Sequence, residues 1–167
     1  MMRRFALLLI PLLAACEGEV ELSGLPVDCV EFAENGIAHD DLTRAGLLGK
    51  LGVPDSLEWS VMQMAGSEDS LFVVRYAGLA VSMHKPAGGT EIVDQVRITD
   101  NTHLRYPQAG IGTSADALKA QFDTITPLEA NEQLIYNCHS HAANDNPVAF
   151  QLRADTVVEI IYTYYMD

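Results

Sequence analysis

The chain has 167 residues, of which 49% are hydrophobic and 20% charged, and its formal net charge is −13. These proportions are typical of a globular protein rather than a disordered one. The acidic balance excludes nucleic acid as a partner, because nucleic-acid binding needs a basic surface, and it disfavours adhesion of the folded domain to anionic lipid. A chain of this length buries enough surface for one core without a metal, so we expect a single compact domain.

The first fifteen residues have the pattern of a secretory signal. Arg3 and Arg4 precede an uncharged apolar run, Phe5 to Leu13, and two alanines follow it. As a helix this run would be about 14 Å long, half of the ~30 Å hydrocarbon core, so it is too short to span a membrane. A positive region, a short apolar region and small residues are the parts of a signal peptide. We therefore expect residues 1–15 to be cleaved.

The residues around this cleavage site, Leu13-Ala14-Ala15-Cys16, resemble the lipobox of bacterial lipoproteins. The resemblance implies that the Cys16 thiol receives a diacylglyceryl group and that its new amine is acylated after cleavage. Two or more acyl chains hold a protein on a membrane, whereas one binds only marginally. Glu17 stands where an aspartate often marks inner-membrane retention, which favours the outer membrane, facing the periplasm. The alternative is an ordinary secretory signal followed by a chance cysteine.

Cleavage would leave 152 of the 167 residues, with eight basic and 23 acidic side chains and a net charge of −15. If Cys16 carries lipid, Cys29 and Cys138 are the remaining cysteines. An even number of cysteines in an oxidising compartment predicts a disulfide between them, closing a loop that would stabilise the fold by about 4–5 kcal/mol. The alternative, a reactive thiol, needs an electropositive neighbourhood, and an acidic chain supplies one poorly.

Residues 16–26 are acidic and small, with Gly24 and Pro26, and we interpret them as a tether to a domain over residues 27–167. A helix is predicted over 27–34, because Asn35-Gly36 is a good helix stop. A second is predicted over 42–51, where Asp40-Asp41 suit the start and Gly52 the end.

From Leu57 the hydrophobic period changes to two, which predicts β-strands. Residues 66–70 are expected to form a polar turn, and Ala77-Gly78 a tight hairpin turn. The expected strands cover residues 57–64, 71–76, 79–84 and 92–99.

The second part of the chain shows a similar order. Thr113 and Asp116 have capping-box spacing, which predicts a helix over 115–122. Further strands are expected over 134–138, 148–153 and 156–165. The two halves, about 38–99 and 110–167, thus each suggest a helix followed by three strands, with some extra strand between them. The predicted fold class is α+β, with short helices packed on one face of an antiparallel sheet in two tandem repeats.

This order of elements resembles small envelope lipoproteins and inhibitor domains of the β-lactamase-inhibitor-protein and outer-membrane-assembly-lipoprotein type. Gly110-Ile111-Gly112-Thr113-Ser114 before a helix and the hairpin from Phe150 to Val157 carry the resemblance. It implies a short helix pair packed on an antiparallel sheet. It also implies a protein inhibitor of an envelope enzyme or an envelope-assembly factor.

Catalytic motifs are not apparent in the sequence, which has no G-x-S-x-G, H-E-x-x-H or C-x-x-C. We therefore predict no catalytic residue, enzyme activity or cofactor. His139 and His141 are alternate residues that would share one face of a strand, and with a further ligand such as Asp145 they could bind zinc or copper. The other interpretation places both histidines in a polar loop beside a disulfide-bonded Cys138.

An antiparallel sheet with helices on one face leaves its other face open. The period-two pattern and the polar residues next to the strands give the candidate binding face: Arg75, Ser82, His84, Asn137 and Glu159. Either this face meets another envelope protein or it is merely solvated. The sequence thus predicts a non-catalytic module, attached to the membrane by its lipid, that binds an envelope protein.

Overall fold

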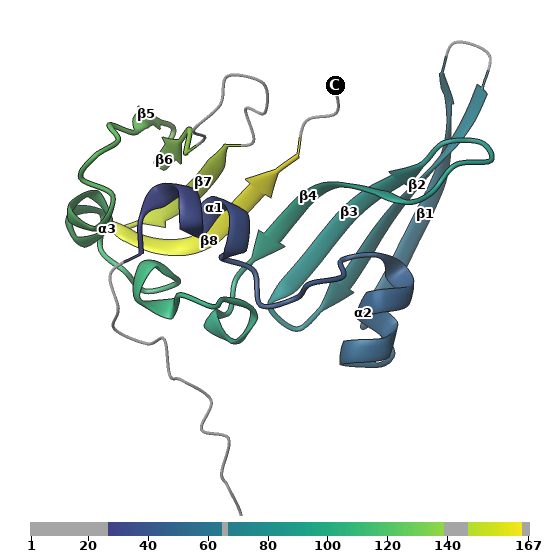
Figure 1. Ribbon diagram of the computed structural model, residues 1–167, viewed down its shortest axis with the longest axis horizontal. Helices are drawn as coiled ribbons and strands as arrows, with labels where there is room; N and C mark the ends of the chain where they lie inside the picture. The colour runs from purple at the N-terminus through teal and green to yellow at the C-terminus, as the bar shows by residue number, and fades with distance from the viewer. Residues whose placement is uncertain (1–26, 65–66, 139–146, 165–167) are drawn as a thin grey trace, which may run out of the picture.

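A computed structural model describes residues 27–64, 67–138 and 147–164 of the chain. These residues form one eight-stranded antiparallel sheet with strand order β1-β2-β3-β4-β8-β7-β6-β5 (Figure 1). The described residues also form three short α-helices, which makes the fold α+β with strands predominating. The predicted signal and tether, including Cys16, and the predicted metal ligands His139 and His141 lie outside the described residues.

The first half of the sheet is a four-stranded meander preceded by two helices. The helices are α1 (Cys29–Asn35) and α2 (Arg44–Leu51), and the strands are β1 (Ser56–Met64), β2 (Ser67–Tyr76), β3 (Leu79–Lys85) and β4 (Ile92–Ile98). The polar turn expected at 66–70 is wrong for residues 67–70, which begin β2 and pair with the end of β1, Ser70 opposite Val61. The polar side chains of residues 68–70 suit a strand because residues 61–63 of β1 beside them are exposed on both faces.

The second half is also a four-stranded meander. After two 3₁₀ turns, Asn101–His103 and Pro107–Ala109, come α3 (Ala115–Gln121), β5 (Leu128–Ala130), β6 (Gln133–Tyr136), β7 (Val148–Arg153) and β8 (Thr156–Thr163). β5 was not predicted, because all three of its residues are exposed and it therefore lacks the alternation that marks a half-buried strand. With β5, the second half has four strands, as the first half does. β4 pairs with β8, so the halves share one continuous sheet.

Local polar residues decide where each helix begins. The side chain of Asp28 accepts a hydrogen bond from the Glu31 backbone N–H, so α1 starts at Cys29 rather than at residue 27. Thr43 and Ser114 cap α2 and α3 in the same way. The capping role expected of Thr113 thus belongs to Ser114, and the Thr113 hydroxyl instead donates to the Gln108 carbonyl.

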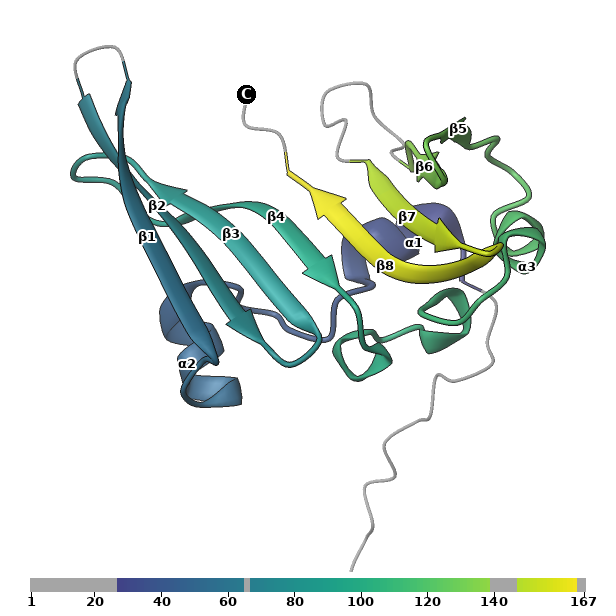
Figure 2. The same cartoon turned by 180° about the vertical axis from the view of Figure 1, so that it is seen from behind.

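The helices lie on one face of the sheet, which we call the covered face; the other is the open face, turned to the viewer in Figure 2. Strand residues that point to the covered face, such as Val81, Val96 and Ile160, are fully buried. The centre of the core is aromatic, with Phe32 of α1 in ring contact with four other rings: Tyr106, Phe122, Phe150 and Tyr162. This burial is the main favourable contribution to folding.

A disulfide joins Cys29 and Cys138, as predicted. Their Cα atoms are 5.1 Å apart, within the range that a disulfide requires, and both residues are only 1% exposed. The bond connects α1 to the chain just after β6, across 109 residues of sequence. Within the described residues, no helix is both long and apolar enough to cross a membrane.

Candidate functional site

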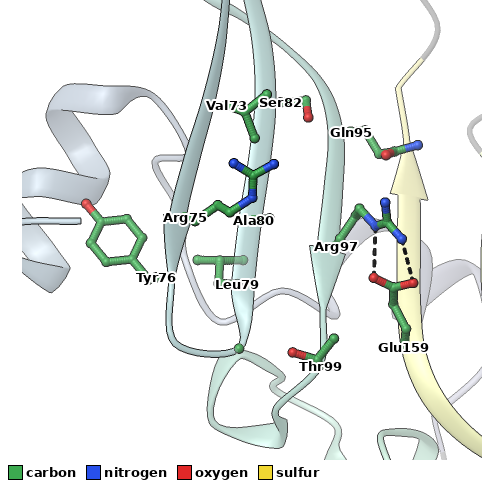
Figure 3. A pocket seen from close by; sticks show the side chains of 11 residues that line it. Val73, Arg75, Tyr76, Leu79, Ala80, Ser82, Gln95, Arg97, Thr99 and Glu159 are labelled. Carbon is green, nitrogen blue, oxygen red and sulfur yellow. Dashed lines mark hydrogen bonds and ion pairs between the residues drawn. The ribbon is translucent and has the colours of Figure 1, made fainter. Parts of the chain in front are cut away.

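The open face carries a pocket of about 340 Å³ over β2, β3 and β4 (Figure 3). Its depth follows from the side chains in one row across the strands, where Arg75, Ala80 and Arg97 are directly opposite one another. Ala80 is short, whereas the two arginines beside it are long, so the row is low in the middle. Ser82, the next residue of β3 on this face, continues the low line. The pocket therefore has a floor of small side chains between two walls of arginine.

Both arginines are held by carboxylates at the outer side of the pocket. Arg97 donates two hydrogen bonds to Glu159, each 2.8 Å long, and Arg75 forms an ion pair with Glu58. The hydrogen bond to Glu159 raises the pKa of Arg97. The Arg97 side chain remains 49% exposed and that of Arg75 43%, so one edge of each guanidinium is open to solvent. The pocket thus offers both donors and acceptors in fixed positions, which suits a polar partner surface.

The structure brings together three of the five predicted face residues, since Arg75, Ser82 and Glu159 all line this pocket. His84 does not line it: its side chain is buried and its Nδ1 lies 2.6 Å from Asp94 Oδ1. A β-bulge after Ser82 makes Asp94 the extra residue of β4 and puts it within reach of His84. Asn137 follows the last residue of β6, and β7 and β8 stand between it and β4.

Sequence reasoning missed several residues of the pocket, among them Arg97, Gln95 and Thr99. These three alternate along the strand that was predicted over 92–99, and this spacing was a signal that they share one face. What the sequence lacked was the pairing of β4 with β8, which puts Arg97 beside Glu159 across 62 residues. Glu58 was missed because its ion pair with Arg75 depends on the pairing of β1 with β2.

A second polar cluster joins the loop before α2 to the first 3₁₀ turn. His103 Nε2 is 2.8 Å from the Ala77 carbonyl oxygen, and His103 Nδ1 is 2.9 Å from His39 Nε2. A carbonyl can only accept, so His103 carries its proton on Nε2 and accepts on Nδ1 from His39 Nε2–H. The remaining nitrogen, His39 Nδ1, is then an unprotonated atom, buried and without a hydrogen-bond partner among the described residues. A proton on His39 Nδ1 would have no acceptor among the described residues, so this arrangement disfavours the charged form of His39.

The His39 pair makes the protein less stable in acid. Burial, and then the nearby His103, lower the pKa of His39 below its ordinary value of 6.5. Because the unfolded chain binds this proton more tightly, the stability is full above about pH 6.5 and falls as the pH drops toward the lowered pKa. The free energy of unfolding in urea should decrease as the pH falls from 7.5 to 5. The slope due to His39 is a fraction of the ~1.4 kcal/mol per pH unit that one proton gives, and the His39→Gln variant should lose this part of the slope. Equal slopes in the two proteins would contradict this assignment.

The described residues contain no group of three or more His, Cys, Asp and Glu side chains arranged to hold a metal ion. Comparison of the chain with protein-family models, curated proteins and solved structures finds no match.

Proposed function

We propose that this protein is a non-catalytic, lipid-anchored module of the cell envelope that binds a partner protein on the open face of its sheet. The observation that carries the proposal is the uncovered face itself, with a pocket between Arg75 and Arg97 that no helix of the described chain occupies (Figures 2 and 3). The lipobox supports the anchor and the outer-membrane address. The buried disulfide supports an oxidising compartment, where such bonds form and persist.

The pocket suits a protein surface better than a small molecule. It is a low row on an exposed sheet, with polar and charged groups spread over five strands from Glu58 to Glu159, rather than an enclosed apolar cavity. Arginines are over-represented in protein interfaces, because they present several donors and a flat apolar surface. A partner side chain entering above Ala80 would meet Ser82, Gln95 and both arginines within one pocket.

The order of elements supports a further part of the proposal, that the fold consists of two tandem units. Each half has a helix before a four-stranded meander, and the strand order runs outward from β4 and β8 in the two directions. Two such units in one sheet double the width of the open face. The resemblance to inhibitor and assembly lipoproteins, stated from the sequence, is compatible with this arrangement.

The proposal predicts a specific contact at Ser82. In cells that produce the protein, a photo-reactive amino acid at Ser82 should cross-link to one envelope protein, whereas the same group at the exposed Thr124 should not. Filling the pocket with Ala80→Trp should reduce the Ser82 adduct about ten-fold, the loss expected when ~1.4 kcal/mol of binding is removed. The matched control, Ala117→Trp on the exposed side of α3, should leave the adduct unchanged.

Adducts that are absent at Ser82, or that Ala80→Trp does not reduce, would contradict binding at this pocket. The anchor is tested on the same material by the intact mass of the membrane-extracted protein. We expect a mass corresponding to cleavage before Cys16 plus acyl chains, and loss of the lipid in a Cys16→Ser variant. An unlipidated chain would refute the anchor without affecting the result at Ser82.

A further inference from the structure

The outer edge of β1 is an edge of the sheet as far as the described residues show it. Among the described residues no strand pairs with it, because β1 is the first strand of the sheet order, and it is nine residues long. The opposite edge, β5, has only three residues. A long edge strand presents a row of backbone donors and acceptors that can pair with another chain, and natural proteins usually protect such edges with charges, prolines or bulges. β1 contains no proline and pairs with β2 without a bulge.

The side chains of β1 on the covered face are apolar and exposed. Leu57, Trp59 and Val61 are 49%, 68% and 50% exposed, although they point to the same side as the core. Helix α2 lies near the Leu57 end of this strip. Between α2 and Leu57 is a cavity of about 360 Å³, which is lined mainly by apolar side chains, including Leu48, Leu57 and Val74. β1 therefore combines an open backbone edge with an apolar strip.

The strip is also nearly free of charge, although the whole chain has a net charge of −13. Glu58 is the one charged residue in β1, and it forms an ion pair with Arg75. Further along the covered face, the guanidinium of Arg44 lies 3.7 Å above the Phe72 ring and pairs with Glu91. β1 therefore presents one charged side chain, which an arginine neutralises, so a second copy that pairs with this strand brings few like charges into contact.

We propose that β1 pairs antiparallel with β1 of a second copy of this chain, so that the two sheets continue into each other about a two-fold axis at Ser60. Side chains alternate along a strand, so only registers that place odd-numbered residues opposite odd-numbered ones keep the apolar strip on one face. The register centred on Ser60 does so and pairs the whole of β1. It places Trp59 of each copy opposite Val61 of the other, the kind of aromatic and β-branched pair that stabilises sheets.

The same register keeps the charges apart. Glu58 lies opposite Met62 of the second copy, and the two Glu58 residues are four positions apart along the strands, about 13 Å. This exceeds the ~8 Å over which salt screens charges at physiological ionic strength. The two Leu57 residues are six positions apart, about 20 Å, so the two α2 helices lie toward opposite ends of the paired strands. An interface built on one strand pair is smaller than most stable interfaces, and we expect a weak dimer with a micromolar dissociation constant.

Trp59 makes the dimer measurable, because it is the only tryptophan in the sequence. The core and the disulfide lie within residues 27–164, so the test uses the mature chain, residues 16–167, with Cys16→Ser in place of the lipid site. Sedimentation velocity from micromolar to near-millimolar protein should show a monomer–dimer equilibrium. The emission of Trp59 should shift to shorter wavelength over the same range, because pairing removes water from the indole.

Two variants test the surface and the register. Val61→Lys puts a charge opposite Trp59 and should weaken the dimer about ten-fold or more, whereas the matched control Leu128→Lys, on the equally exposed β5, should not. In the proposed register, Ser60 of one copy lies opposite Ser60 of the other, whereas Met62 lies opposite Glu58. Ser60→Cys should therefore give a disulfide-linked dimer and Met62→Cys should not. A monomer at every concentration would overturn the proposal, as would a dimer that Val61→Lys leaves intact. Protection of Trp59 by a different protein but not by a second copy would also overturn it.

Discussion

Replacing Cys29 and Cys138 together by alanine should lower the free energy of unfolding by about 4–5 kcal/mol. The bond closes a loop between residues 109 positions apart, and in the chain-entropy model a loop of about a hundred residues gives ~4.7 kcal/mol. Both cysteines are buried, and the bridge joins two elements that would otherwise be independent in the unfolded chain. A loss of this size is a large part of the 5–15 kcal/mol that stabilises a typical domain.

Reduced wild-type protein is the control for this double variant, since it retains both side chains but not the covalent bond. Guanidinium unfolding of the oxidised, reduced and double-alanine proteins should place the last two close together and well below the first. If the reduced protein matches the oxidised one, the cross-link does not constrain the unfolded chain. If only the alanine variant is destabilised, the loss comes from the space left in the core rather than from the bond.

Phe32→Ala should have the second-largest effect, a loss of about 3–5 kcal/mol, the range for removing a large aromatic side chain from a core. Phe32 is fully buried on α1, and its ring centroid lies 5.6 Å from those of Phe122 and Phe150 and 5.9 Å from that of Tyr162. These rings come from the end of α3, from β7 and from β8, so one side chain fastens the N-terminal helix to the second half of the sheet. The vacated volume cannot close without moving all three.

The measurement is again guanidinium unfolding, with two comparisons. Phe32→Leu keeps an apolar side chain in the same place and should lose much less stability than Phe32→Ala. Leu128→Ala, at a residue that is 65% exposed on β5, should change the unfolding free energy by less than about 0.5 kcal/mol. A small effect of Phe32→Ala would show that α1 is not required for the packing of the second half.

Much of the sheet could be predicted because its inner strands are half-buried and therefore alternate. β3 illustrates this: Val81 and Met83 on the covered face are apolar and buried, whereas Ala80 and Ser82 between the buried residues are partly exposed. The disulfide was predictable for a different reason, since assigning Cys16 to lipid leaves one possible pair. The α+β class and the helix-covered face follow from the same two periodicities, 3.6 and 2.

The edges of the sheet were harder. β5 is exposed along its whole length, so its sequence shows no pattern, and it forms only because β6 offers an edge to pair with. The start of β2 is polar for the same reason, as it pairs with β1 in a solvated hairpin. Secondary structure that depends on a neighbouring strand, and not on burial, leaves little trace in a single sequence.

The candidate site shows the same limit. The open face could be anticipated from alternation, and Arg75, Ser82 and Glu159 were found in this way. Arg97 was not, because its importance depends on the pairing of β4 with β8 between distant parts of the chain. His84 has the right position on β3 but not the right role, because a bulge supplies Asp94 as its partner.

The place of the disulfide has a mechanical consequence. Cys29 is two residues after Val27, where the described chain begins, so any pulling force on the N-terminal side reaches the bridge before it reaches a strand. The bridge carries part of that load directly to Cys138, at the end of β6, while α1 spreads the rest into the aromatic core. A load applied on the N-terminal side therefore enters the second half of the sheet and the core before it reaches the half that carries Arg75 and Ser82, where the proposed partner would pull.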